Sequence, residues 1–133
     1  MAPVSRFGLA PPRRFVLPAL LLLLTEEPGH GYSLESRLRQ FRFGQIDRPM
    51  VYRALSQLDA DGLVESRSEV SKVGQTRRVY SITSLGEQVL RVWMSVIKEE
   101  RESLCMVLRR YQATGTADAA LARVEGGWGS SRR

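Results

Sequence analysis

The sequence predicts a mainly α-helical protein with one small β-hairpin. Between residues 15 and 62, apolar side chains recur at helical spacing in three separate segments. Between residues 63 and 82 the pattern changes to two short runs of β-prone residues, and helical spacing then returns up to residue 112. The length of 133 residues suits one domain with a core of moderate size.

The first helix is expected at about 15–26, and it is apolar nearly all round. Such a helix has no face suited to water, so we expect it to be buried. Pro18 falls in the first turn, where no amide donor is needed, and Pro28-Gly29 ends the helix. The preceding Arg13-Arg14 makes the segment resemble an export signal, but no cleavage site follows.

The second helix is expected at about 31–42, and Arg37 and Arg39 should lie in solvent. Its inward face is formed by Leu34, Leu38 and Phe41. The third helix begins after Asp47, which can cap it, and ends near Gly62. Its inward face is formed by Val51, Ala54, Leu55 and Leu58.

The outward face of the third helix carries donors that suit DNA. Arginine fits guanine edges, glutamine fits adenine edges, and serine and tyrosine fit phosphates. The residues on this face are Arg48, Pro49, Tyr52, Arg53, Ser56 and Gln57. The same residue types are common on a helix face that is merely solvated, so the face alone leaves both interpretations open.

Two short strands are expected at 63–67 and 77–82, joined by a loop at about 70–75. From Ser71 to Tyr80 the chain has three basic residues and no acidic one, namely Lys72, Arg77 and Arg78. A flexible basic hairpin beside a polar helix face suits contact with phosphates. Three helices followed by a hairpin is the order of a winged helix-turn-helix, in which the third helix enters the major groove and the hairpin is the wing.

The overall charge agrees with this interpretation. The chain has 20 basic and 14 acidic side chains, which gives a formal net charge of +6. Lys72 and Lys98 are the lysines, so the remaining basic residues are arginines, which prefer planar partners such as phosphate, carboxylate and guanine edges. We expect double-stranded DNA as the partner and a cytoplasmic, nucleoid-associated protein. An anionic membrane surface or an acidic protein would be the next partners to consider.

Four sequence runs resemble the PadR family of bacterial transcriptional regulators. They are His30 to Leu34, Val51 to Leu58, Asp61 to Ser66 and Arg77 to Gly86, and the resemblance covers about residues 14–110. It implies a winged-helix domain, a C-terminal dimerisation helix and repression by operator binding. The basic, proline-rich lead into residues 15–18 is similar to a subgroup described as polyhydroxybutyrate-responsive repressors.

The resemblance also implies which side chains contact DNA. It assigns DNA contacts to Tyr52, Arg53, Lys72, Arg77 and Arg78, and it brings Tyr32 to a phosphate. We add Gln75, which stands in the wing where the family often has proline, and we expect this wing to be more mobile. The family's Ser-Pro-Gly-Thr is replaced by the run from Asp47 to Met50, which we interpret as a change in operator preference.

The final helix, expected over 84–112 with a cap at Thr83-Ser84, spans roughly 43 Å and carries a heptad stripe broken at Glu100. The stripe is longer than one small domain can cover, so we predict a homodimer in which the first helix helps to clasp the partner helix. The predicted dimerisation residues are Leu20, Leu23, Leu90, Trp93, Ile97, Leu104, Val107 and Tyr111. The alternative is that the stripe packs on the chain's own first helix. Trp93 is a candidate for lining a pocket for a small apolar effector.

The chain is thus expected to comprise a flexible basic arm at 1–12, a winged helix-turn-helix domain at 13–83, a dimerisation helix at 84–113 and a flexible tail at 114–133. The alternative function is a protein-interaction module that has lost DNA binding, for which a basic wing is not needed. An enzyme is not expected, because paired carboxylates, a phosphate-binding loop and a nucleophile–base pair are all missing. With one Cys and one His, no metal site or cofactor is expected either.

Overall fold

The computed structural model describes residues 13–115, and the predicted arm and the part of the predicted tail after Gly115 lie outside these residues. The chain divides into two compact units, Met1–Met94 and Ser95–Arg133. In the described residues no helix is long and apolar enough to cross a membrane.

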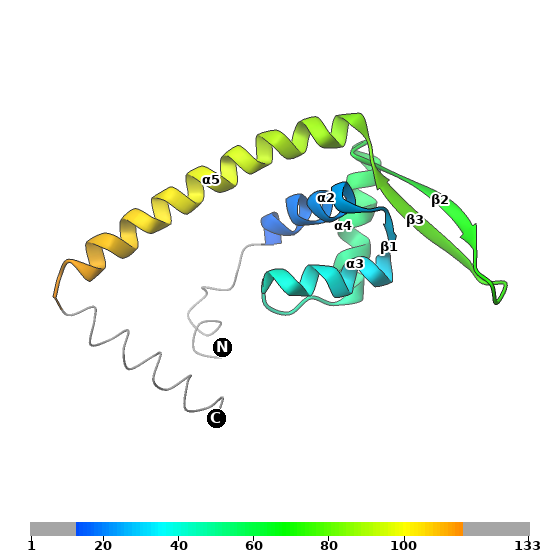
Figure 1. Ribbon diagram of the computed structural model, residues 1–133, viewed down its shortest axis with the longest axis horizontal. Coiled ribbons are helices and arrows are strands. Elements are labelled where there is room, and N and C mark those ends of the chain that lie inside the picture. Colours follow the sequence, from blue (N-terminus) through cyan, green and yellow to red (C-terminus); the bar gives the residue numbers. More distant parts are fainter. Residues whose placement is uncertain (1–12, 116–133) are drawn as a thin grey trace, which may run out of the picture. The chain divides into compact units, whose positions relative to one another are not determined.

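The first unit is a winged helix-turn-helix, which confirms the fold class predicted from the sequence (Figure 1). Strand order in the antiparallel sheet is β1-β3-β2, and β2 and β3 form the hairpin that we call the wing. The elements in chain order are η1 (Arg13–Phe15), α2 (Val16–Glu26), β1 (Gly29–His30), α3 (Gly31–Leu38), η2 (Arg39–Phe41), α4 (Arg48–Ala60), β2 (Val64–Val70), β3 (Thr76–Ile82) and α5 (Ser84–Gln112).

The core is built around α2, as its all-round apolar sequence predicts. Leu20 and Leu21 have no exposed surface. The other side chains with no exposed surface come from the inward faces of α3 and α4: Leu34, Leu38, Val51, Leu55 and Leu58. Because α2, α3 and α4 bury these faces against one another, the opposite face of α4 is left for solvent or a ligand.

Side-chain caps fix where two of the helices begin. The backbone N–H of Met50 donates to Oδ1 of Asp47 at 2.8 Å, which confirms Asp47 as the cap of α4. Thr83 Oγ1 accepts from the N–H of Gly86 at 3.0 Å and donates to the carbonyl of Gly62 at 2.7 Å. The second contact ties the beginning of α5 to the turn that follows α4.

Two expectations for the second predicted helix are wrong. Phe41 is 40% exposed because the helix tightens into the 3-10 turn η2 and Arg42 adopts a left-handed conformation with φ of 61°, so the helical spacing is lost before Phe41. Arg37 is not solvated: its side chain is 18% exposed and it donates to the carbonyl oxygen of Leu23 at 2.6 Å. Arg37 therefore adds a second donor to a carbonyl near the end of α2 that already accepts the backbone N–H of Glu27 at 3.1 Å.

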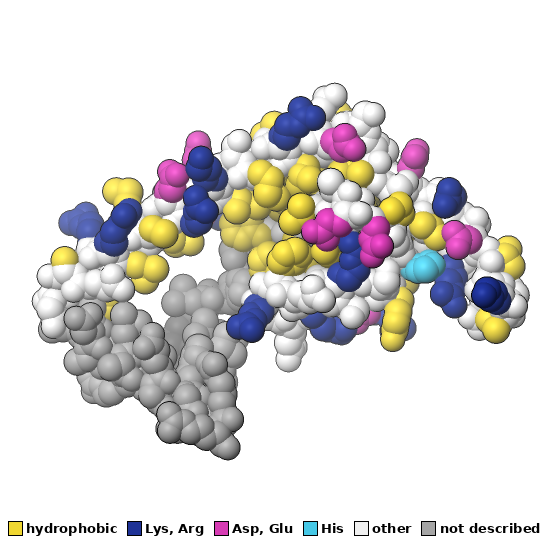
Figure 2. Space-filling view, in the orientation of Figure 1, with side chains coloured by type: hydrophobic (Ala, Val, Ile, Leu, Met, Phe, Trp, Pro, Cys, Tyr) yellow, Lys and Arg dark blue, Asp and Glu magenta, His cyan; other side chains and the backbone are white. Residues whose placement is uncertain are grey.

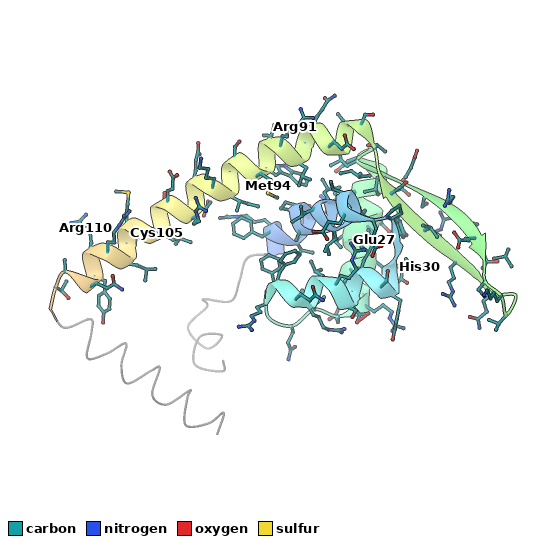
Figure 3. The ribbon with its side chains drawn as sticks, in the orientation of Figure 1. Glu27, His30, Arg91, Met94, Cys105 and Arg110 are labelled. Atoms are coloured by element: carbon teal, nitrogen blue, oxygen red, sulfur yellow. The ribbon has the colours of Figure 1, made fainter. Side chains whose placement is uncertain are left out.

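Helix α5 has the predicted bounds, and its first turns belong to the core. Leu90 is 8% exposed, and Trp93 and Met94 pack against the buried cluster. Figure 3 shows Arg91 and Met94 on opposite sides of this helix. Trp93 thus packs against the core of its own chain.

The structure corrects part of the predicted dimer surface. Leu20, Leu23 and Leu90 are buried in the core of their own chain, so they offer almost no surface to a second chain. They were assigned to the interface because an apolar helix is equally suited to burial against its own core or against a partner. In the second unit, Leu104 and Val107 are 59% and 64% exposed and Tyr111 is exposed as well.

Candidate nucleic-acid interface

The outward face of α4 carries the polar and basic side chains that the sequence assigns to it. Arg48, Tyr52, Arg53, Ser56 and Gln57 are all exposed, while Val51, Leu55 and Leu58 on the opposite face have no exposed surface. This division follows from the 3.6-residue period of the helix, which separates the two sets by about half a turn.

The wing places its basic residues beside acidic ones that the linear sequence keeps apart. In the register of β2 and β3, Arg77 lies opposite Glu69 and Arg78 lies opposite Ser68. The guanidinium of Arg78 donates to Oγ of Ser66 at 2.7 Å, which fixes it along the wing. Lys and Arg side chains are prominent on the hairpin in Figure 2, with acidic side chains among them. The wing is therefore basic but not free of acids.

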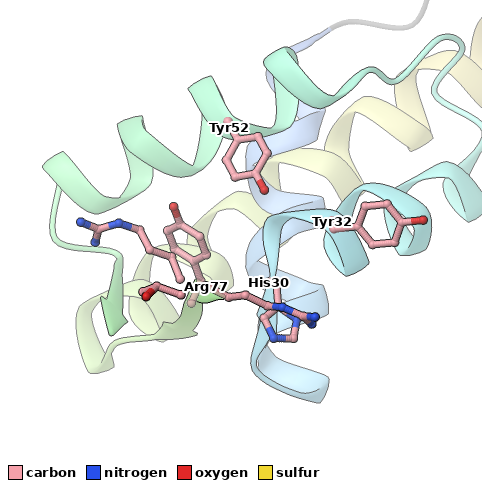
Figure 4. Close-up of a pocket in the computed structure, with 7 residues that line it drawn as sticks. His30, Tyr32, Tyr52 and Arg77 are labelled. Carbon is pink, nitrogen blue, oxygen red and sulfur yellow. The ribbon is translucent and has the colours of Figure 1, made fainter. Parts of the chain in front are cut away.

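A cavity of about 560 Å³ lies where α3 begins, between α4 and β3 (Figure 4). Phenol, imidazole and guanidinium groups line it, and these are groups that can donate hydrogen bonds to an anion. The lining residues are His30, Tyr32, Tyr52, Thr76, Arg77, Arg78 and Tyr80. Four of them, Tyr32, Tyr52, Arg77 and Arg78, are predicted site residues.

Close packing positions the tyrosines of this cavity. A Cβ atom added to Gly31 would lie 2.5 Å from two carbons of the Tyr52 ring, so the ring lies directly against the backbone of α3. Tyr80 is 5% exposed, and its burial raises the pKa of its phenol. The positive charge of Arg78 opposes that rise, while Tyr52 and Asp59 add to it. Tyr80 consequently stays protonated at neutral pH and keeps its O–H as a donor.

Two further hollows flank α4. One of about 520 Å³ on the wing side is lined by Ser56, Asp59, Ala60, Arg78 and Tyr80. The other, of about 360 Å³, lies toward the beginning of α2 and is lined by Arg14, Val16, Leu17, Met50, Arg53, Ala54 and Gln57. The predicted residues of α4 thus divide between two flanks, with Tyr52 and Ser56 toward the wing and Arg53 and Gln57 toward α2.

A buried acid lies next to the beginning of α4. Glu35 of α3 is 7% exposed and pairs with Arg39 and Arg48, at 2.5 Å and 3.3 Å. Burial by itself raises the pKa of Glu35, but the hydrogen bonds and positive charges of Arg48 and Arg39 outweigh it and hold the pKa below the ordinary value. The guanidinium of Arg48 also lies 5.1 Å from the centre of the Tyr32 ring.

Sequence reasoning missed several polar residues that line these hollows or adjoin them, among them His30, Glu35, Asp59, Thr76 and Tyr80. Alternation along the strand gives no signal even for Tyr80, because Val79 beside it is buried as well. Lys72 and Gln75 are exposed in the turn of the wing and do not line the cavities described above. Among the described residues there is no cluster of His, Cys, Asp or Glu that could hold a metal ion.

Comparison with known proteins gives a family and several similar structures. Residues 20–92 match the transcriptional regulator PadR-like family. A candidate transcriptional regulator from Thermoplasma acidophilum is 27% identical, with a TM-score of 0.64 over 69% of this chain and 88% of that one. A PadR family transcriptional regulator from Eggerthella lenta is 26% identical, with a TM-score of 0.59 over 72% of this chain and 84% of that one.

Bacillus subtilis PadR, whose crystal structure is in complex with operator DNA, is 25% identical to this chain. The TM-score is 0.57, and the match covers 62% of this chain and 48% of that one, so this chain matches only about half of the Bacillus protein. No curated protein matches the sequence.

Proposed function

Because the chain belongs to the PadR-like family of transcriptional regulators, we propose that it is a sequence-specific DNA-binding repressor that acts as a homodimer. In this proposal α4 enters the major groove and the wing contacts phosphates and the minor groove. The family is one of regulators, which agrees with the expectation that the chain is not an enzyme.

The observation that carries the proposal is the cavity between α4 and β3. Tyr32 and Tyr52 bring phenol groups to it, and Arg77 brings a positive charge. A DNA phosphate needs this combination of neutral and charged donors. The exposed face of α4 lies beside the cavity, so a backbone seated there would bring base edges toward Arg53 and Gln57. The complex of Bacillus subtilis PadR with operator DNA supports the same kind of partner.

The homodimer is proposed from the exposed apolar side chains of α5. In the second unit the side chains of Leu104, Val107 and Tyr111, which belong to the heptad stripe, are each at least 45% exposed. Apolar residues at heptad spacing on an exposed helix are typical of a coiled-coil seam. A two-fold dimer would present two copies of α4 to half-sites about one turn of DNA apart.

The proposal is tested by selecting genomic fragments that the purified protein binds, and by measuring the affinity for a selected fragment over a series of salt concentrations. We expect a linear fall of log K with log salt, with a slope of about −0.9 for each phosphate neutralised. A failure to select any fragment, or an affinity that salt does not change, would contradict DNA binding and favour the protein-interaction module.

A further inference from the structure

Glu35 places a negative charge inside the basic face of the domain. Its side chain is only 9% exposed, although an acid at this place repels a nearby phosphate. A buried carboxylate also costs free energy unless hydrogen-bonded cations compensate it. We therefore expect the arginines that contact Glu35 to account for its place in the DNA-binding face.

Both carboxylate oxygens of Glu35 accept hydrogen bonds from arginines. Oε2 accepts from Arg39 at 2.5 Å, and Oε1 accepts from Nε of Arg48 at 3.3 Å. Arg39 also donates to the carbonyl oxygen of Ile46 at 3.2 Å, in the residue just before the cap of α4. Through these contacts α3 is connected to the first residue of α4.

Arg48 is fixed at two points and still reaches solvent. Its Nε is directed to Glu35, its guanidinium carbon lies 5.1 Å from the centre of the Tyr32 ring, and its side chain is 56% exposed. Because the Nε edge faces Glu35, the terminal nitrogens are the part that can meet a ligand. A side chain that is ordered before binding loses less conformational entropy when it binds.

We propose that Glu35 is a positioning residue that sets the DNA sequence preference of this protein through Arg48. By fixing the guanidinium plane against Tyr32, Glu35 lets the terminal nitrogens of Arg48 present two donors at a set angle to a guanine edge. Arg39 keeps the carboxylate oriented. This inference rests on the proposed function, because it concerns the same DNA-binding face.

The test compares the full-length wild type with Glu35→Gln on two DNA duplexes of equal length, a selected fragment and an unrelated one. For Glu35→Gln we expect the affinity for the selected fragment to fall roughly 10- to 100-fold, the discrimination that one arginine–guanine pair provides. Affinity for the unrelated fragment should not fall, because a negative charge has been removed. Glu87→Gln, the matched control on exposed α5 surface, should leave the ratio of the two affinities unchanged.

Arg48→Lys provides a second variant, at a side chain that is itself 56% exposed. It keeps the positive charge but not the planar guanidinium, so it should lose the preference for the selected fragment while its salt slope stays at the wild-type value. In an Arg48→Ala background, Glu35→Gln should cause no further loss of affinity for the selected fragment, because Glu35 acts through Arg48. General destabilisation would weaken both duplexes alike.

The inference is overturned if Glu35→Gln or Arg48→Lys keeps the wild-type ratio of affinities, or if Glu35→Gln and Arg48→Ala weaken binding additively. These outcomes differ from a failure of the proposed function. In that case the wild type itself would select no fragment, and this inference would fall with it.

Discussion

The ring of Tyr52 in α4 lies against the backbone of Gly31 in α3, with no space for a β-carbon between them. A Cβ atom at Gly31 would come within 2.8 Å of the Tyr52 hydroxyl and within 2.5 Å of two ring carbons. The absence of a side chain at Gly31 thus sets where Tyr52 stands in the cavity beside the wing.

Gly31→Ala is therefore expected to displace the Tyr52 ring and to weaken DNA binding about tenfold or more, the value of a hydrogen bond to a charged phosphate. The free energy of unfolding should change little, because Tyr52 is 39% exposed and can turn outward. DNA titration and thermal unfolding measure the two effects. In a Tyr52→Ala background, Gly31→Ala should have almost no effect on DNA affinity. If the two substitutions weaken DNA binding additively, Gly31 does not act by positioning the Tyr52 ring.

Arg53 and Arg78 lie on opposite flanks of α4, one toward α2 and one toward the wing. Replacing both with Ala should abolish binding to a selected fragment at physiological salt. Arg78→Ala should reduce the magnitude of the salt slope by about 0.9, since this wing arginine is assigned to a phosphate. Arg53→Ala should mainly lower the preference for the selected fragment, since Arg53 is assigned to base edges. Lys98→Ala, on α5, removes the same charge and should leave the slope unchanged. Wild-type binding by the double variant would show that the contacts are assigned wrongly.

The dimer proposal rests on exposed side chains in the second unit, so it can be tested without disturbing the core. Leu104→Glu combined with Val107→Glu should give monomers in sedimentation experiments, because four like charges would meet in the seam. Met106→Glu, also on exposed surface but off the stripe, should remain dimeric. An unchanged mass for the double variant would reject the seam.

Gly86 lies where α5 passes close to Leu63, just after the turn that follows α4. A β-carbon there would overlap the carbonyl oxygen of Leu63 and the side chain of Ile82. Gly86→Ala should therefore destabilise the domain by about 1–3 kcal/mol, the usual cost of overpacking, despite the better helix propensity of Ala. Thermal unfolding measures this, with Glu87→Ala as the exposed neighbour for comparison. A raised melting temperature for Gly86→Ala would contradict the close approach.

Local signals made much of the fold predictable. The cap at Asp47 and the bounds of α5 are set by residues within a few positions of each other, so the sequence contains them directly. The cavity is different, because the pairing of β1 with β3 brings His30 opposite Val79 and beside Tyr80. A strand of two residues is too short to show an alternation of apolar and polar side chains, so the sequence does not predict this pairing.

Burial of the first helix was predicted, but the element that buries it was not. A helix that is apolar on all sides looks the same whether it packs on its own chain or on a partner, and Leu20 and Leu23 were assigned to the wrong surface for this reason. The pair of Glu35 and Arg48 was hidden for a related reason. The two residues are 13 positions apart, and only the packing of α3 against α4 brings them together.

The ion pairs of Glu35 should also make the stability of the protein depend on pH in a specific direction. The folded pKa of this carboxyl lies below its unfolded value, because the hydrogen bonds and charges of Arg48 and Arg39 outweigh the effect of burial. Its contribution is therefore fully present above the ordinary glutamate pKa of about 4.3 and is lost as the pH falls through the lower, folded pKa. Denaturant unfolding of wild type and Glu35→Gln between neutral and acid pH measures this contribution. All other carboxyl groups are common to both proteins, so the difference between them should be largest at neutral pH and shrink toward acid pH. A difference that stays constant with pH, or grows as the pH falls, would mean that the charge of Glu35 does not stabilise the link between α3 and α4.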